Sequence, residues 1–142
     1  MAKSEISPSL IASYKAADYQ ATVDTDVITL HIGQYAASLY QLLAQLDHQC
    51  AVFITAFNPL SQRQNPQENL VRNTQLRTAL TLYTNLIFEG TSTDPSKLWP
   101  AEQSFLALGI DLKTAKTLGK QFGQNAVVWI DADAIPRLIL LR

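Results

Sequence analysis

The most constraining feature of the sequence is the apolar segment Cys50-Ala-Val-Phe-Ile-Thr-Ala-Phe57, which Asn58 and Pro59 end. Successive side chains of a β-strand point to opposite faces, and this segment is apolar on both of them. A strand of this kind must be covered on both sides or nearly so. The segment is therefore predicted to be a central strand of a sheet that carries packed layers.

Four segments carry helix signals, namely a capping residue, a first-turn proline or an apolar stripe at helical spacing. The clearest stripe contains four leucines at i, i+3, i+4 and i+7: Leu39, Leu42, Leu43 and Leu46. The other three helices are predicted after Ser7-Pro8, from Pro66 to about residue 83 behind the cap Asn65, and after the cap Asp111.

Six strands are predicted from alternation, β-branched residues and bounding turn signals, at residues 24–32, 50–57, 86–88, 104–108, 125–130 and 137–141. Residues 90–100 are predicted to be a loop. Strand–helix–strand connections favour parallel neighbours, whereas the last two strands are close enough for an antiparallel hairpin. The predicted fold is α/β (α+β) in two or three layers, with a mixed sheet of about six strands, four helices and a closing C-terminal hairpin.

Length and charge narrow the possible functions. The 142 residues fit one domain, 1–142, and the net charge is −1 without any basic run. Nucleic acids and anionic membranes are therefore not expected as partners, because both require a concentrated positive surface. No apolar stretch approaches the ~20 residues that cross a bilayer, and no signal peptide is recognisable. A cytoplasmic protein is expected.

Two asparagines mark the third predicted helix as a candidate site. In projection, Asn69 and Asn73 fall on the side that carries Leu76 and Leu80 and that must face the core. A buried amide without partners costs about 1–3 kcal/mol, so each asparagine requires hydrogen bonds. Those partners are either a bound ligand or the neighbouring backbone, and the sequence leaves both readings open.

The segment from Asn58 to Arg77 follows the central strand, at the end where ligands bind in many α/β sheets. Gln124, next to Asn125 in a second helix-to-strand turn, is able to complement it. First-turn N–H groups and an arginine are suited to an anion or a carboxylate. The candidate ligand-binding residues are Asn58, Ser61, Arg63, Asn69, Asn73 and Gln124.

Metal and cofactor sites are not expected. His31 and His48 lie far apart without other ligand types at zinc-binding spacing, and the single cysteine, Cys50, cannot form a metal cage. Asp131 and Asp133 are read as turn residues rather than a metal pair. No glycine-rich phosphate loop or nucleophile elbow is present, so no cofactor is expected.

Three functions remain. The first is a non-catalytic binding or regulatory module for a small polar or anionic ligand or a partner's backbone, because amides give directional hydrogen bonds but little acid–base power. The second is a hydrolase or nucleotide-processing enzyme with Glu68, Glu102 or Asp131 as general base. It requires a carboxylate with a raised pKa close to the amides. The third is a structural or homo-oligomeric protein that pairs through its last strand.

The sequence resembles a bacterial family of short proteins that is known only as domain of unknown function number 3293. The resemblance runs in order along nearly the whole chain. It implies a bacterial, stand-alone domain and no particular activity. Recurring polar positions of that family coincide with Asn58, Ser61, Asn69 and Gln124. The segments that carry the resemblance are Tyr14-Lys-Ala-Ala-Asp-Tyr19, Ile54-Thr-Ala-Phe-Asn-Pro59 with Ser61, Glu68-Asn69 with Arg72 and Leu76, Trp99-Pro100, Glu102 with Ser104-Phe105, and Phe122-Gly-Gln-Asn-Ala126 with Asp131 and Arg137-Leu138.

Overall fold

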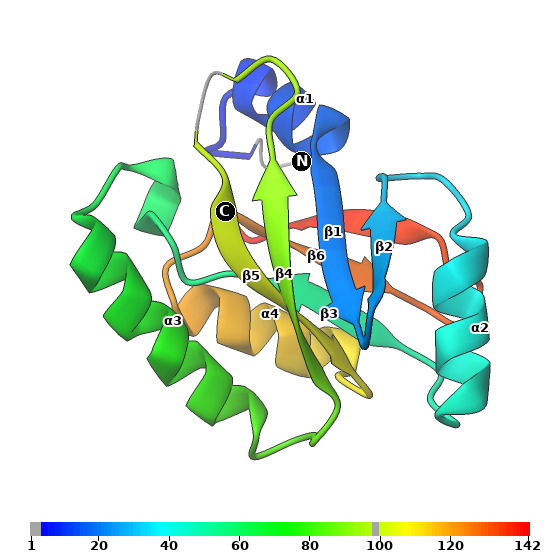
Figure 1. The fold of residues 1–142 in the computed structure, drawn as a ribbon. Coiled ribbons are helices and arrows are strands. Elements are labelled where there is room, and N and C mark those ends of the chain that lie inside the picture. Colours follow the sequence, from blue (N-terminus) through cyan, green and yellow to red (C-terminus); the bar gives the residue numbers. More distant parts are fainter. Residues whose placement is uncertain (1–3, 98–99) are drawn as a thin grey trace.

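The computed structural model describes residues 4–97 and 100–142, so Trp99 and part of the predicted loop 90–100 lie outside the described residues. Helices separate single strands and strand pairs along the chain (Figure 1). In order they are α1 (Pro8–Ala16), β1 (Asp18–Val23), β2 (Asp26–Leu30), α2 (Ala37–Gln45), β3 (Ala51–Ile54), the 3-10 turn η1 (Pro59–Ser61), α3 (Pro66–Leu80), β4 (Ile87–Thr93), β5 (Glu102–Leu108), α4 (Leu112–Gln121), β6 (Ala126–Ile130) and β7 (Pro136–Leu140).

The predicted capping residues begin their helices. Side chains of Ser7, Asn65 and Asp111 each accept a hydrogen bond from a backbone N–H of the first helical turn. Such a bond satisfies one of the N–H groups that lack a partner within the helix. The four-helix prediction is confirmed, although α3 ends at Leu80 rather than near residue 83.

The strands of the described residues form one antiparallel sheet in the order β2-β1-β4-β5-β3-β6-β7. The α+β fold class and the closing β6–β7 hairpin are confirmed. The predicted parallel neighbours do not occur among the described strands, so the prediction of a mixed sheet is wrong. The strands joined by α2, α3 and α4 do run in the same direction, but the members of each pair are not neighbours: three strands lie between β2 and β3, and one strand lies between the members of each of the other two pairs. β5 separates β3 from β4, and β3 separates β5 from β6.

Two of the strand predictions are corrected. Residues 24–32, predicted as one strand, contain only β2, because Asp24 turns the chain with a φ of 55° and pairs β1 against β2. The sequence hides this turn because no glycine or proline marks it. β4 continues through Gly90 to Thr93, where a loop was predicted. Gly90 serves a close approach, since a Cβ there would lie 2.4 Å from the carbonyl oxygen of Gln20.

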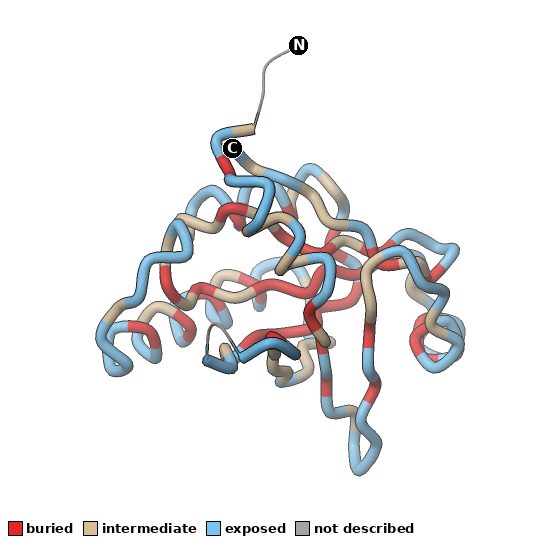
Figure 2. Tube along the Cα trace, turned by 90° about the horizontal axis from the view of Figure 1, so that it is seen from above, coloured by how far each residue is buried: buried red, intermediate tan, exposed pale blue. Residues whose placement is uncertain are grey.

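β3 is the central strand that its sequence predicts, with all four residues buried between β5 and β6. Ala51 and Phe53 join a core that includes the α2 leucines, whereas Val52 and Ile54 join a core under α3 and α4. α3 and α4 thus cover one face of the sheet and α2 packs on the other (Figure 1). Buried segments run through the centre of the molecule in the view from above (Figure 2).

The two ends of the sheet are tied together by the segment that follows β2. The N–H of Gly33 donates to the carbonyl of Pro136 at 2.8 Å, and the N–H of Ala36 donates to that of Ala134 at 3.0 Å. These bonds curl the sheet around its inner core. The first described residue lies beside the C-terminus, where Ser4 Oγ donates to the carbonyl of Arg142.

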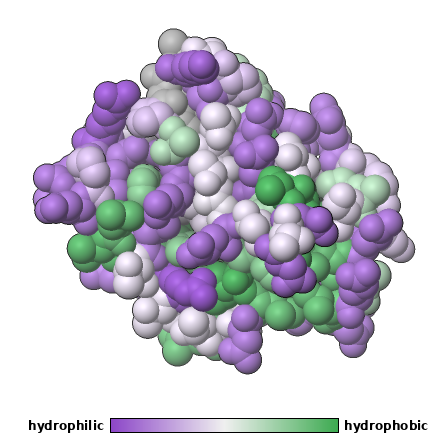
Figure 3. All heavy atoms as spheres, viewed as in Figure 1, coloured by the Kyte–Doolittle hydropathy of each residue, from purple (hydrophilic) through white to green (hydrophobic). Residues whose placement is uncertain are grey.

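The face of the molecule seen in Figure 3 is largely polar, with apolar residues gathered over α3 and at the lower right of the view. Leu70 and Val71 of α3 are 47% and 58% exposed, while Leu76 and Leu80 of the same helix are fully buried. Among residues 4–97 and 100–142, no helix combines the length and the apolar character needed to span a membrane.

Candidate functional site

The loop that leaves β3 is held by reciprocal amide bonds between Asn58 and Asn69. The backbone N–H of Asn58 donates to Asn69 Oδ1 at 3.0 Å, and Asn69 Nδ2 donates to Asn58 Oδ1 at 2.8 Å. The same Asn58 oxygen accepts the N–H of Gln64 at 3.0 Å. Both asparagines are therefore engaged mainly with each other and with the loop backbone.

Asn73 anchors the segment one turn further along α3. Its Oδ1 accepts the N–H of Ala56 at 3.0 Å, and its Nδ2 donates to the carbonyl of Gln103 at 3.2 Å. Asn69 and Asn73 are each only 4% exposed, so the inward orientation predicted from the helical projection is confirmed. Their hydrogen bonds hold neighbouring parts of the chain in place, and a ligand-binding role for either residue stays a prediction.

The anchored loop has an unusual backbone. Asn58, Leu60 and Ser61 have φ angles of 46°, 56° and 59°, in the left-handed region. Asparagine tolerates this region, whereas a left-handed leucine or serine costs about 1–2 kcal/mol. The surrounding structure has to hold such a conformation, and strained segments of this kind concentrate at functional sites.

The turn between α4 and β6 supplies part of that support. The N–H of Leu60 donates to the carbonyl of Gly123 at 2.7 Å, and Gln124 Nε2 donates to the carbonyl of Phe57 at 3.1 Å. Gln124 thus lies against the same loop as Asn58, and its predicted part in ligand binding stays a prediction. The contact joins it to the loop backbone.

Glu102, the first residue of β5, faces the loop. Its Oε2 accepts a hydrogen bond from Asn58 Nδ2 at 2.8 Å. Burial raises the pKa of Glu102 to about 7, although the bond from Asn58 acts in the opposite direction. Within the described part of the chain, Oε1 has no hydrogen-bond partner and is not sealed from solvent, so it is free to meet a ligand.

Glu102 lines a cavity of about 130 Å³ between α1, the loop after β3 and the strands β3 to β7, here called the Glu102 cavity. Its polar lining includes four residues predicted as ligand-binding and three that are new to the set. They are Asn58, Ser61, Arg63 and Gln124, together with Tyr14, Ser104 and Asn125. Asn69 and Asn73 do not line it. The apolar lining includes Leu10, Phe57, Pro100, Val127 and Leu138.

A pair of hydroxyls forms one wall of the cavity. The hydroxyls of Tyr14 and Ser61 are hydrogen-bonded to each other, and Asn125 Nδ2 donates to them at 3.0 and 3.3 Å. Arg142 orients this amide by donating to Asn125 Oδ1 at 3.0 Å. Since one hydroxyl uses its proton on the other, the pair retains a single free O–H donor.

Arg63 also lines the cavity and is exposed. No hydrogen bond or ion pair to Arg63 occurs among the residues that the structure describes. In particular, its nitrogens do not come within ion-pair distance of Glu102. The cavity therefore carries an unpaired cation and an unpaired acid.

Tyr14, Tyr19 and Asn125 escaped the sequence prediction. Tyr14 matched the apolar stripe of the first helix, which concealed its hydroxyl, and Asn125 was noted only beside Gln124. Tyr19 lies in β1 and donates its O–H to the carbonyl of Tyr14. Burial, followed by the charges of Tyr14 and Glu102, raises the pKa of Tyr19, so this phenol remains a donor.

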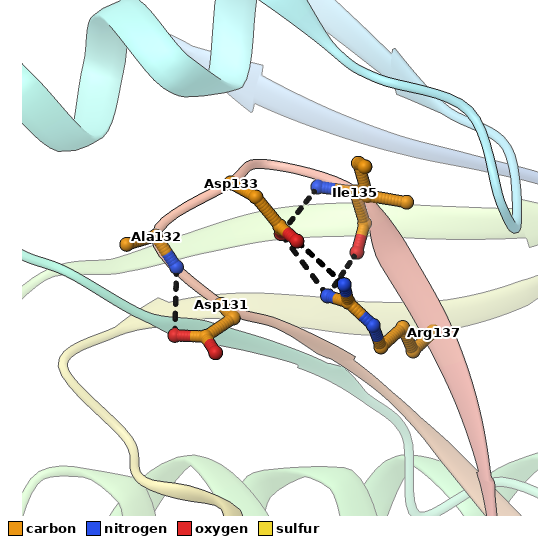
Figure 4. Close-up of polar contacts among 5 residues, drawn as sticks. All are labelled: Asp131, Ala132, Asp133, Ile135 and Arg137. Carbon is orange, nitrogen blue, oxygen red and sulfur yellow. Dashed lines mark hydrogen bonds and ion pairs between the residues drawn. The ribbon is translucent and has the colours of Figure 1, made fainter.

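The aspartates of the last hairpin have structural partners (Figure 4). Asp133 forms an ion pair with Arg137 and accepts the N–H of Ile135 at 3.1 Å. The bonds from Arg137 lower the pKa of Asp133 to about 2. Asp131 accepts the N–H of Ala132 at 2.8 Å. These contacts agree with the reading of both residues as turn aspartates.

The remaining candidates bring no metal centre. His31, predicted to have no ligand-type neighbour, does contact Asp18, with 2.7 Å between Nε2 and Oδ1. This pair stands alone, since no group of three or more possible metal ligands occurs among the described residues. Glu68 is exposed. Cys50 is free and partly exposed, and burial raises its pKa, which disfavours the reactive thiolate.

Comparison with known proteins identifies a family. The model of the family described as "Protein of unknown function (DUF3293)" matches residues 54–127, more than half of the chain, and the chain belongs to this family. The matched range includes Asn58, Ser61, Glu102 and Gln124. No curated protein and no solved structure matches the chain.

Proposed function

We propose that this member of the DUF3293 family binds a small polar molecule in the Glu102 cavity. The observation that carries the proposal is the carboxyl group of Glu102, which lines the cavity with one oxygen unpaired and has no cationic partner among the described residues. Removing a carboxyl from water is unfavourable unless hydrogen bonds or charges compensate for it. A ligand that donates to Oε1 would supply that compensation.

The size of the cavity supports a ligand with few atoms. Its volume of about 130 Å³ lies well below the roughly 300–1,000 Å³ typical of pockets for drug-sized molecules. The lining combines polar groups with apolar side chains, which is the usual composition of a small-molecule site. Asn58, Asn69 and Gln124 hold the loop in this proposal, and the ligand meets Glu102, Ser61 and Arg63.

A ligand screen tests the proposal. Small amines, amino acids, sugars and carboxylic acids are added singly to the protein, and binding is followed by thermal unfolding and ligand-observed NMR. A ligand present at 100 times its Kd adds about 2.7 kcal/mol to the stability of the folded state. We expect compounds that stabilise the wild type and the Glu68→Gln control but not Glu102→Gln. Equal stabilisation of Glu102→Gln would place the binding site elsewhere.

A second candidate is an enzyme, a hydrolase or nucleotide-processing activity with Glu102 as general base. It is favoured by the pKa of about 7, because proton transfer is most effective when the pKa of the catalytic group lies near the working pH. NMR spectra of each bound compound over several hours distinguish the two functions. Conversion that Glu102→Gln abolishes and Glu68→Gln retains would support the enzyme, and unchanged compounds support the binding module.

We also propose that the protein acts in the cytoplasm on a small molecule rather than on nucleic acid. The net charge of −1 supports the second part, since phosphate binding requires clustered cations. Self-association through β7 is a separate prediction. β7 is an edge strand of the sheet, but the carbonyls of Ala134 and Pro136 are already used by the segment after β2. Light scattering at high protein concentration tests it.

A further inference from the structure

We infer that the ligand of the Glu102 cavity is a small zwitterion, with its ammonium group on Glu102 and its carboxylate on Arg63. The inference rests on the proposed function, because it specifies the chemistry of the molecule that this cavity would hold. It starts from two charged side chains that lack an ion-pair partner. Glu102 and Arg63 line the same cavity, carry opposite charges, and are not ion-paired with each other or with another described residue.

A ligand with one charge would leave one of these residues unmatched. An amine would pair with Glu102 alone, and a simple carboxylate would pair with Arg63 while adding a negative charge near Glu102. A zwitterion satisfies both residues and itself brings no net charge to the site. The guanidinium presents a planar fork of donors that fits a carboxylate, and it keeps its charge throughout the accessible pH range.

The hydrogen-bonding groups of the cavity are divided in the same way. Glu102 Oε1 is an unpaired acceptor, which suits an N–H of an ammonium group. The Tyr14–Ser61 pair retains one free O–H, a donor that suits a carboxylate oxygen. Asn125, which donates to both hydroxyls, directs their remaining proton away from itself. Acceptor and donors thus come from different residues of one lining.

The rest of the lining limits the remainder of the ligand. Leu10, Phe57 and Val127 present carbon to the cavity, and the volume of about 130 Å³ restricts its length. An aliphatic portion of a few carbons would bury apolar surface there, at roughly 25 cal/mol for each Å² removed from water. Amino acids with short aliphatic side chains fit these requirements.

Proton release supplies a signature of the ammonium contact. Burial raises the pKa of Glu102 to about 7, so near neutrality a substantial share of the empty protein holds this carboxyl protonated. An ammonium ion binds the ionised carboxylate more strongly, and its arrival therefore expels a proton. The heat of binding at pH 6.5 should then depend on the ionisation enthalpy of the buffer, and this dependence should be absent in Glu102→Gln.

Isothermal titration tests the inference with defined probes. The panel consists of the twenty common α-amino acids, β-alanine and 4-aminobutanoate. The tightest binder is then compared with the amine that lacks its carboxylate and with the acid that lacks its ammonium group. For leucine these would be 3-methylbutylamine and 4-methylpentanoate. We expect each to bind about tenfold more weakly than the zwitterion, the effect of losing one hydrogen-bonded charge.

Two variants assign the contacts. Arg63→Ala should weaken the zwitterion to the affinity of its amine and leave the amine unchanged, whereas Lys116→Ala, which removes an exposed cation of α4, should alter neither. Glu102→Gln should weaken both. Circular dichroism confirms that each variant is folded before titration.

The possible failures are distinguishable. If the amine binds as tightly as the zwitterion and Arg63→Ala has no effect, the zwitterion inference is wrong while the proposed function stands. The inference also fails if no member of the panel binds but another small polar compound does so through Glu102. If every binder is unaffected by Glu102→Gln, the proposed function itself is wrong.

Discussion

Two carboxylate sites of the molecule, the Glu102 cavity and the β6–β7 turn, offer the most informative comparison. In the turn, Asp133 is exposed, paired with Arg137 and bonded to a backbone N–H, and its pKa falls to about 2 (Figure 4). In the cavity, Glu102 is partly buried, bonded to one neutral amide and without a cation, and its pKa rises to about 7. The two carboxyls are displaced in opposite directions.

The difference shows which property makes a carboxylate a candidate site. Sequence alone offered Glu68, Glu102 and Asp131 as equivalent candidates for a general base, and Asp131 with Asp133 is the more conspicuous motif. In the structure, the conspicuous pair has its hydrogen bonds satisfied locally. Glu102 lacks such local partners, and the one hydrogen bond to its side chain comes from Asn58, which is distant in sequence. Availability for a ligand therefore follows from burial and from a missing partner, and neither is visible in a short motif.

The largest expected effect concerns the pH dependence of stability. The pKa of Glu102 is raised from an ordinary 4.5 to about 7 in the folded protein. At this site the folded state thus binds more protons than the unfolded state between these values, so the contribution of Glu102 to stability is highest below pH 4.5 and is lost as pH rises through 7. At about 1.4 kcal/mol for each pH unit, the loss amounts to about 3 kcal/mol. Glu102→Gln should remove it, as urea unfolding at pH 5 and pH 8 would measure.

The control for this experiment is Glu68→Gln, which removes an exposed carboxylate from the first turn of α3. It should retain the wild-type difference between pH 5 and pH 8. If Glu102→Gln also retained that difference, Glu102 would have an ordinary pKa. Glu102 and Asp133 would then differ only in how far each side chain is exposed to solvent.

The next effect concerns the anchor of the loop. Asn69→Ala removes the acceptor of the Asn58 N–H and the donor to Asn58 Oδ1, both of them buried. Because an unpaired buried donor costs about 1–3 kcal/mol, we expect a loss of unfolding free energy of about 2–3 kcal/mol. Thr74→Ala, whose hydroxyl bonds within α3 on the exposed face, is the matched control and should change stability far less. A loss below that of the control would mean that the loop does not depend on Asn69.

Much of the fold could be predicted because it follows from local signals. Caps at Ser7, Asn65 and Asp111 place three helices, and residues 50–57, which are apolar on both faces of a strand, identify the central strand. The strand order could not be predicted, because β5 inserts between β3 and β4 only through contacts distant in sequence. The Asp24 turn and the polar strand through Gly90 were missed for a related reason. Their signals are a left-handed aspartate and a close approach to Gln20, which appear only in three dimensions.

The candidate site could likewise be predicted only as far as local sequence signals reach. Helical projection correctly turned Asn69 and Asn73 inward, and the position after the central strand correctly located the loop. Whether an inward amide meets backbone or ligand depends on what lies opposite, and here it is the backbone of Ala56 and Asn58. Tyr14 entered the site because α1 packs across the loop, a placement that no feature of its own helix encodes.

A smaller effect is expected at the second anchor. Gln124→Ala removes the partly buried hydrogen bond that crosses to the carbonyl of Phe57, together with a local one to the carbonyl of Phe122, and leaves the Leu60–Gly123 backbone bond in place. The loss should be about 1 kcal/mol of unfolding free energy, the net worth of one such bond. Ligand affinity should fall with it if the loop shapes the cavity. A loss as large as that of Asn69→Ala would show that both turns hold the loop equally.

The smallest effect is expected in the β6–β7 turn, where Asp133→Asn keeps the size of the side chain and removes its charge. The pair with Arg137 is exposed, and exposed ion pairs add little because water and salt screen them. At pH 7 the variant should unfold at nearly the wild-type denaturant concentration.

Asp133 has a lowered pKa, so its contribution is present above pH 4 and is lost as pH falls toward 2, the opposite sign to Glu102. When the unfolding free energy is measured from pH 2 to pH 8, its slope against pH should therefore differ between Asp133→Asn and wild type only at the acidic end. A large loss at pH 7, unaffected by salt, would mean that the hairpin pair is as consequential for the fold as the buried amides. The contrast between the two carboxylate sites would then rest on their pKa values alone.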